Sequence, residues 1–184
     1  MEESDVRNSL AGLRVWTIGH STRPIEEFIE ALHANQIATL IDVRQFPGSR
    51  KYPQYGKAAL SESLTKESID YIHIVELGGR RKPNPNSENT LWRNESFRAY
   101  ADYMETKEFE AGIDRAIKFA TEKPTAIMCA EAVWWRCHRS LISDYLKSRG
   151  AEVIHIINAT KTEIHPYTSA ARIIDGRLSY RKYV

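Results

Sequence analysis

The 184-residue sequence has few cysteines, little net charge and no long hydrophobic run. Two cysteines cannot form the disulfide framework of a small secreted protein. A net charge of +2 gives no strong overall field for nucleic acid or a membrane, although basic side chains can still cluster locally. The apolar runs are strand-sized, well short of the roughly 20 residues that span a bilayer. Residues 1–5 are acidic and contain no signal-peptide core. We therefore expect a cytoplasmic protein with reduced thiols.

No internal repeat, low-complexity segment or linker divides the sequence. Its length is sufficient for one domain with a sizeable core. We expect residues 1–12 to form a flexible N-terminal segment and residues 13–184 to form a single α/β domain.

Short apolar runs alternate with amphipathic stretches along most of the chain. This alternation predicts a three-layer α/β/α fold of the Rossmann-like or flavodoxin-like kind, with a mostly parallel sheet of four to five strands. The dipeptide Asp175-Gly176 indicates a C-terminal hairpin, either as an antiparallel edge or as a flap. Residues 80–94 are predicted to form a long polar loop. The predicted strands are 13–18, 37–43, 69–75, 125–129 and 152–157, and the predicted helices begin near Pro24 or cover about 56–67, 95–105, 107–121 and 136–148.

The segment 129–139 contains the most chemistry in the sequence. It includes both cysteines, a carboxylate, an imidazole and two guanidiniums, between an apolar strand and an amphipathic helix. In a parallel sheet the ligand crevice lies beyond the carboxyl ends of the strands. The predicted strands deliver several polar groups and a glycine pair to that rim: His20, Ser21, Asp42, Arg44, Gly78, Gly79, Cys129 and Glu131.

Each of these residues also has a structural interpretation. Cys129 could be a small buried apolar side chain, and Asp42 could bond backbone amides. The two tryptophans at 134 and 135 could pack on the core or stack against a base. The histidines at 73, 155 and 165 are expected in strand or tail positions without a catalytic part.

Three chemistries fit the segment. The first is nucleophilic catalysis by Cys129, with arginines that bind an anion and stabilise the thiolate. The order of cysteine, loop, arginine and helix resembles rhodanese and cysteine-phosphatase loops, but the spacing from Cys129 to Arg136 is one residue too long for a phosphatase. The second is a metal site, for which Cys129, Cys137 and His138 are possible ligands. The third is acid–base chemistry on a nucleotide or nucleic acid.

Several blocks together resemble one prokaryotic family, known as domain of unknown function 488. The blocks are Thr17–Ser21, Asp42–Arg44 with Arg50, Leu77–Gly79, Cys129–Glu131 and Cys137–Arg139, within a resemblance from about residue 14 to 157. The resemblance implies a single α/β domain and no established activity. Its recurrent polar positions carry over as His20, Ser21, Asp42, Arg44, Arg50, Gly78, Gly79, Cys129, Glu131, Cys137, His138 and Arg139.

We therefore expect an enzyme that acts on an anionic small molecule or a nucleotide-like group. The alternatives are a nucleic-acid-binding or base-processing protein and a metal-binding domain. No cofactor, metal or oligomeric state is assigned. The expected catalytic residues are Cys129, Glu131, His20, His138 and Asp42. The expected anion-binding residues are Ser21, Arg44, Arg50, Gly78, Gly79 and Arg139.

Overall fold

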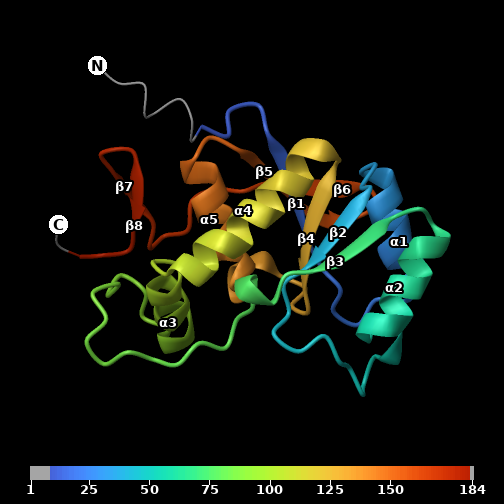
Figure 1. Cartoon of the computed structure of the whole chain (residues 1–184), viewed down its shortest axis with the longest axis horizontal. Helices are drawn as coiled ribbons and strands as arrows, with labels where there is room; N and C mark the ends of the chain where they lie inside the picture. The colour runs from blue at the N-terminus through green and yellow to red at the C-terminus, as the bar shows by residue number, and fades with distance from the viewer. Residues whose placement is uncertain (1–8, 183–184) are drawn as a thin grey trace.

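A computed structural model describes residues 9–182 and shows an α/β fold around one six-stranded sheet (Figure 1). The strand order is β3-β2-β4-β1-β5-β6. The first five strands in this order are parallel, and β6 pairs antiparallel with β5. The strands are β1 (Arg14–Gly19), β2 (Thr39–Asp42), β3 (Asp70–His73), β4 (Thr125–Cys129), β5 (Glu152–Asn158) and β6 (Lys161–Ile164), with a separate hairpin of β7 (Arg172–Ile174) and β8 (Arg177–Ser179).

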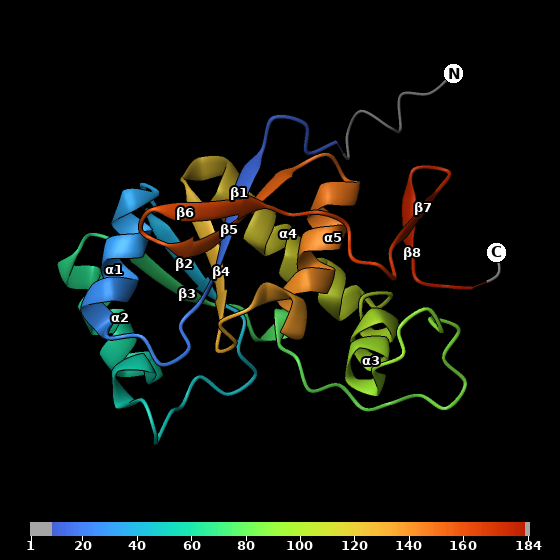
Figure 2. The same ribbon diagram turned by 180° about the vertical axis from the view of Figure 1, so that it is seen from behind.

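Helices cover both faces of the sheet. One core contains Phe28 and Leu60 from the helices α1 and α2, and the other contains Tyr100, Phe109 and Leu141 from α3, α4 and α5. The two groups of helices lie on opposite sides of the strands in both views (Figures 1 and 2). The helices are α1 (Ile25–Ala34), α2 (Lys57–Lys66), α3 (Glu95–Tyr103), α4 (Lys107–Glu122) and α5 (Arg139–Ser148), with 3₁₀ turns at Pro53–Tyr55, Val75–Leu77 and Trp134–Arg136.

Local sequence explains these elements. Every residue of β2 and of β4 is buried, as expected for central strands covered on both faces. Side-chain caps begin two of the helices: Asn94 accepts from the amides of Ser96 and Phe97, and Thr106 accepts from Phe109 N–H. Gly150 follows α5 in a left-handed conformation with φ 99°, which ends that helix.

The predicted three-layer, mostly parallel architecture is confirmed. The sequence pattern missed β6, because Lys161–Ile164 is largely exposed and Ile164 points its apolar side chain outward, at 65% exposure. This strand, and not the predicted hairpin, provides the antiparallel edge. The hairpin β7-β8 forms its own two-stranded sheet beside α5 (Figure 2).

Strand β4 occupies a special position in the topology. The connection that leaves it runs through α5 on one face, whereas those that leave its neighbours β1 and β2 run through α1 and α2 on the other face. A crevice forms where adjacent connections diverge in this way. The carboxyl end of β4, at Cys129, therefore lies between two such divergences.

Two further predictions concern the periphery. Residues 1–8 of the expected flexible segment lie outside the described residues, and Leu10 N–H donates to the Arg149 carbonyl at 2.7 Å. Among residues 9–182, no helix has the length and apolar character needed to cross a bilayer.

Candidate functional site

Two buried thiols lie together at the end of β4. Cys129 is the last residue of the strand, and Cys137 follows the 3₁₀ turn that leads to α5. Burial raises the pKa of Cys129 well above its ordinary value, and its hydrogen bond with Cys137 adds to this. Burial also opposes ionisation of Cys137, but the bond from Cys129 and the charge of Arg139 lower its pKa to about 7. The more acidic thiol is therefore Cys137.

Residues at the start of α5 surround the Cys137 sulfur. The backbone N–H of Arg139 donates to it at 3.4 Å, so the sulfur serves as an acceptor for the first turn of the helix. The His138 ring lies on its other side, with Nδ1 3.6 Å from the sulfur and Nε2 3.2 Å from the Val43 carbonyl. The Leu77 carbonyl also hydrogen-bonds this ring, and burial lowers the pKa of His138, which favours its neutral form. When Nε2 donates to the Val43 carbonyl, Nδ1 can accept the thiol proton. Tyr100 packs against this ring at 5.0 Å.

Arg139 is the largest fully buried side chain of the described residues. Its guanidinium hydrogen-bonds both thiols, donates to the Glu131 carbonyl at 2.7 Å and reaches Thr17 Oγ1 at 3.3 Å. Among residues 9–182 it forms no ion pair with a carboxylate, and its Nε has no hydrogen-bond partner. A buried cation without a contacting anion is costly, so a Cys137 thiolate is the charge that suits this environment.

A second cluster lies at the ends of β2 and β1. Arg44 donates Nε and its terminal nitrogen to the Asp42 carboxylate, at 2.9 and 2.7 Å, and Tyr71 O–H donates to the same carboxylate at 2.5 Å. The other terminal nitrogen of Arg44 contacts His20 Nε2 at 3.3 Å. His20 lies stacked on Tyr55 at 4.2 Å. Burial lowers the pKa of His20 to about 4, and Arg44 and Arg139 contribute, so the ring is neutral at pH 7.

Three glycines permit the close contacts of the site. A side chain at Gly19 would lie 1.7 Å from the Glu131 carbonyl, so the segment after β4 crosses directly over this residue. At Gly79 a Cβ would lie 3.1 Å from His138 Nδ1, and at Gly78 it would meet Gln45. The predicted glycine pair therefore makes room for His138 and Gln45, which occupy the space that we expected substrate to approach.

The structure alters the expected roles of some predicted residues. The expected catalytic residue Glu131 has an exposed side chain, and only its carbonyl contacts the cluster. Asp42 is buried, but both carboxylate oxygens already accept bonds, which argues against a general base. Arg50 is exposed in the loop after β2. Ser21 has a positive φ of 48°, and its carbonyl lies 2.9 Å from His20 Nδ1.

Sequence analysis missed a buried histidine pair beside Arg139. His155 Nδ1 lies 2.6 Å from Thr17 Oγ1, and His155 Nε2 lies 2.9 Å from His165 Nδ1. The sequence did contain a sign of this pair. His155 lies two residues after Val153, on the same buried face of β5, where a polar side chain requires a partner. Trp134 stacks on His155 at 4.5 Å, so this tryptophan is part of the packing, whereas Trp135 is 53% exposed.

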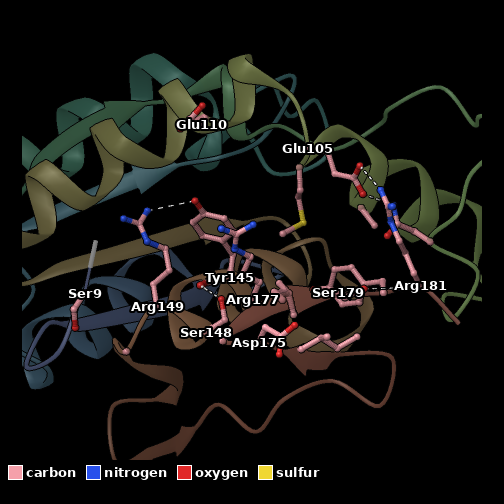
Figure 3. A pocket seen from close by; sticks show the side chains of 18 of the residues that line it. Ser9, Glu105, Glu110, Tyr145, Ser148, Arg149, Asp175, Arg177, Ser179 and Arg181 are labelled. Carbon is pink, nitrogen blue, oxygen red and sulfur yellow. Dashed lines mark hydrogen bonds and ion pairs between the residues drawn. The ribbon is translucent and has the colours of Figure 1, made fainter. Parts of the chain in front are cut away.

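A broad groove lies elsewhere in the molecule, between α3, α4, α5 and the hairpin β7-β8 (Figure 3). None of the predicted site residues lines it. Arg181 on its rim bonds Glu105 at 3.0 Å, and Arg149 bonds Tyr145 O–H at 3.3 Å. The groove is thus separate from the thiol cluster.

The donor sets do not favour a metal centre. Within residues 9–182, no three His, Cys, Asp or Glu side chains are grouped as ligands of one ion. A structural zinc site uses four such ligands and a catalytic one three. The possible set of Cys129, Cys137 and His138 therefore does not form a metal site in this conformation.

Fold and site together define a doubly wound α/β domain with a buried cysteine–arginine–histidine cluster at the end of its middle strand. The chain belongs to the family described as domain of unknown function DUF488, whose model matches residues 24–146. That match extends from the start of α1 to most of α5 and includes both cysteines. No curated protein and no solved structure is detectably similar to the chain.

Proposed function

We propose that this protein is a thiol-dependent enzyme that uses Cys137, and not Cys129, as its nucleophile on a small anionic substrate. One observation carries the proposal: the Cys137 sulfur contacts the Arg139 backbone amide, the Arg139 guanidinium and His138. These groups are the ones that activate a thiol in known enzyme chemistry, namely a helix N-terminus, a cation and a base.

The chemistry follows from this arrangement. His138 Nδ1 accepts the thiol proton, and Arg139 stabilises the thiolate that results. The sulfur lone pair then forms a bond to an electrophilic atom of the substrate, and the bond to the leaving group breaks with its electron pair. A second nucleophile releases the group from sulfur. The Cys129 thiol, which stays protonated, donates a hydrogen bond to the thiolate.

The preference for an anion rests on two buried guanidiniums. Arg44 and Arg139 are both close enough to His20 to lower its pKa. Arg44 is partly neutralised by Asp42, whereas Arg139 has no such contact. These two guanidiniums are the groups between β1, β2 and β4 that would bind the anionic part of a substrate.

Access to the sulfur requires motion, because Cys137 is only 4% exposed. The segment 130–136 leads from one cysteine to the other and contains exposed residues, including Glu131 and Trp135. Arg139 holds it through the Glu131 carbonyl. We propose that this segment moves when substrate enters.

The test is the pH dependence of alkylation, followed separately at each cysteine by mass spectrometry. We expect Cys137 to react with a midpoint near pH 7 and Cys129 to react much more slowly at every pH. Iodoacetate and iodoacetamide are reagents of similar size that differ in charge. The ratio of the iodoacetate rate to the iodoacetamide rate should be higher at Cys137 than for a free thiol in solution. Denatured protein controls for labelling efficiency. A Cys137 that stays inert, or that titrates near the unperturbed value of about 8.5, contradicts the proposal.

Arg139→Lys should weaken this activation. Lysine keeps the charge but loses the planar group that bonds both thiols and the Glu131 carbonyl. If the midpoint rises by about one unit, a size typical of a changed charge contact, the thiolate fraction at pH 7 falls about fivefold. Arg136→Lys is the matched control, because Arg136 is exposed on the same segment. Equal alkylation rates in both variants would remove Arg139 from the mechanism.

The nucleic-acid alternative stays a prediction. Its expected contacts are the 80–94 loop and the two tryptophans. The Arg81 guanidinium of the loop lies 3.4 Å from the Tyr103 ring centroid and Trp134 packs on His155, whereas Trp135 is 53% exposed. A gel shift at several salt concentrations tests it, since binding through phosphates weakens steeply with salt. We also propose a cytoplasmic location, which two free thiols support.

A further inference from the structure

A continuous line of buried hydrogen bonds runs from Arg139 to a carboxylate on the same helix. Arg139 reaches Thr17 Oγ1 at 3.3 Å, and Thr17 reaches His155 at 2.6 Å. His155 reaches His165 at 2.9 Å, and His165 Nε2 reaches the Asp144 carboxylate at 2.9 Å. We call Thr17, His155, His165 and Asp144 the buried relay. All four side chains are at most 1% exposed, and they come from β1, β5, the segment after β6, and α5.

The chemistry of its ends gives the relay a direction. A carboxylate only accepts, so His165 Nε2 donates to Asp144, and in a His165 ring that carries one proton Nδ1 is then an acceptor. His155 therefore donates from Nε2 and accepts at Nδ1 from the Thr17 hydroxyl. That leaves a Thr17 lone pair for Arg139, which can only donate. This assignment gives every ring nitrogen of the two histidines and the Thr17 hydroxyl a partner.

The surroundings hold this arrangement. Asp144 also accepts from Thr168 N–H at 2.9 Å and from Tyr180 O–H at 2.8 Å, which fixes its position. Burial lowers the pKa of His155 to about 2, with help from His165 and Arg139, so its ring stays neutral throughout the working pH range. Trp134 stacks over the same ring and limits its rotation.

We propose that the buried relay is a positioning device for the thiol site, in which Asp144 holds Arg139 against Cys137 through three intermediate side chains. The inference rests on the proposed function, because it assigns the relay to the activation of Cys137. Asp144 is a counter-charge for Arg139 that acts through the relay and does not contact the guanidinium. The face of Arg139 towards the thiols is consequently left for a thiolate. The four relay members are positioning residues, since the Cys137 sulfur contacts His138, Arg139 and Cys129 instead.

The decisive experiment compares two substitutions at one position. Thr17→Val keeps the shape but removes the hydroxyl, whereas Thr17→Ser keeps the hydroxyl. We expect Val to raise the Cys137 alkylation midpoint by about one unit, the usual size of such a change, and Ser to leave it unchanged. Thermal unfolding of both variants controls for stability. An alkylation midpoint that is unchanged or lower in the Val variant contradicts the proposal that the buried relay positions Arg139.

Other titratable or polar groups face the same site and are held constant in this comparison. They are Cys129 on β4, His138 on α5, His20 after β1 and Tyr100 on α3. If the hydrogen bonds were only structural, the Val variant would lose thermal stability but the pH midpoint of Cys137 alkylation would not change.

Asp144→Asn provides an independent variant. Asparagine still accepts from His165 but carries no charge, so Arg139 loses its counter-charge and the Cys137 thiolate is the anion left to balance it. The Cys137 midpoint should therefore fall, with Cys129 little affected. An unchanged midpoint here overturns the role of Asp144 as a counter-charge.

Nitrogen NMR separates failure of the relay from failure of the proposed function. His155 and His165 should both carry their proton on Nε2 in the wild-type protein, whatever the reactivity of Cys137. The opposite tautomers, or a charged ring at pH 7, would refute the relay directly. The predicted tautomers together with an inert Cys137 would instead refute the nucleophile, and with it the assignment of the relay to thiol activation.

Discussion

Two buried aspartate–arginine systems serve the same sheet in different ways. Asp42 and Arg44 are two residues apart and in direct contact at 2.7 Å. Asp144 and Arg139 lie on one helix, but Thr17, His155 and His165 separate their side chains. In both systems the carboxylate is fully buried.

The difference shows that direct contact with a carboxylate leaves an arginine fewer hydrogen bonds for other partners. In the direct pair, Asp42 accepts from three nitrogens of Arg44 and from Tyr71, so both of its carboxylate oxygens are occupied. In the relayed system, Arg139 keeps its bonds for the thiols and for the Glu131 carbonyl. We infer that the direct pair stabilises the fold and the relayed one serves the reactive sulfur.

Asp42→Asn should cause the largest loss of stability. It leaves the Arg44 guanidinium buried without its counter-charge, and breaking a buried pair in this way costs about 3–5 kcal/mol. Urea unfolding measures the free energy. Asp70→Asn is the matched control on β3, because its ion pair with Lys123 is exposed and its loss should not be measurable.

The same Asp42 variant should leave the Cys137 alkylation midpoint unchanged, provided that measurements stay below the unfolding transition. A shift as large as that expected for Asp144→Asn would mean that the two systems are not separate.

The pH dependence of stability should show the neutral histidine beside the direct pair. The folded-state pKa of His20 is about 4, below the unfolded value of 6.5. As the pH falls, the unfolded chain binds this proton first. The contribution of neutral His20 to the free energy of unfolding is therefore fully present above about pH 6.5. It is lost as the pH falls from 6.5 to 4, by up to about 3 kcal/mol.

His20→Gln should flatten this part of the stability profile, because glutamine does not titrate. The control is His33→Gln on the exposed end of α1, a histidine outside the site. Equal slopes in the wild type and in His20→Gln would show that His20 is not held neutral.

The sequence placed the two members of the direct pair at the rim, in separate roles, more readily than it placed the relay, for a physical reason. Asp42 and Arg44 follow one apolar strand, and parallel topology alone places them at the rim. Cys137 and Arg139 were likewise found from their position at the start of α5. The periodicity of each strand also predicted the layers of the fold.

The relay could not be found in the same way, because its members come from four separate places in the chain. Their contact depends on the register of β1 with β5, where Thr17 lies opposite His155, and on β6 turning back to bring His165 alongside. The pattern missed β6, so nothing in the sequence placed His165 next to His155. The relative acidity of the two thiols likewise depends on side-chain contacts with Arg139, which residue spacing does not determine.

Glu131→Gln should have the smallest effect, and it tests the boundary of the site. The sequence favoured this carboxylate as catalytic, but the structure directs it to solvent and uses only its carbonyl, which Arg139 bonds at 2.7 Å. The substitution preserves that carbonyl. Stability should change by less than about 0.5 kcal/mol, as at ordinary surface positions, and the Cys137 midpoint should stay near pH 7. A loss of reactivity with unchanged stability would return the carboxylate to the reaction, because removing its charge is the only change that the variant makes at the segment between the two cysteines.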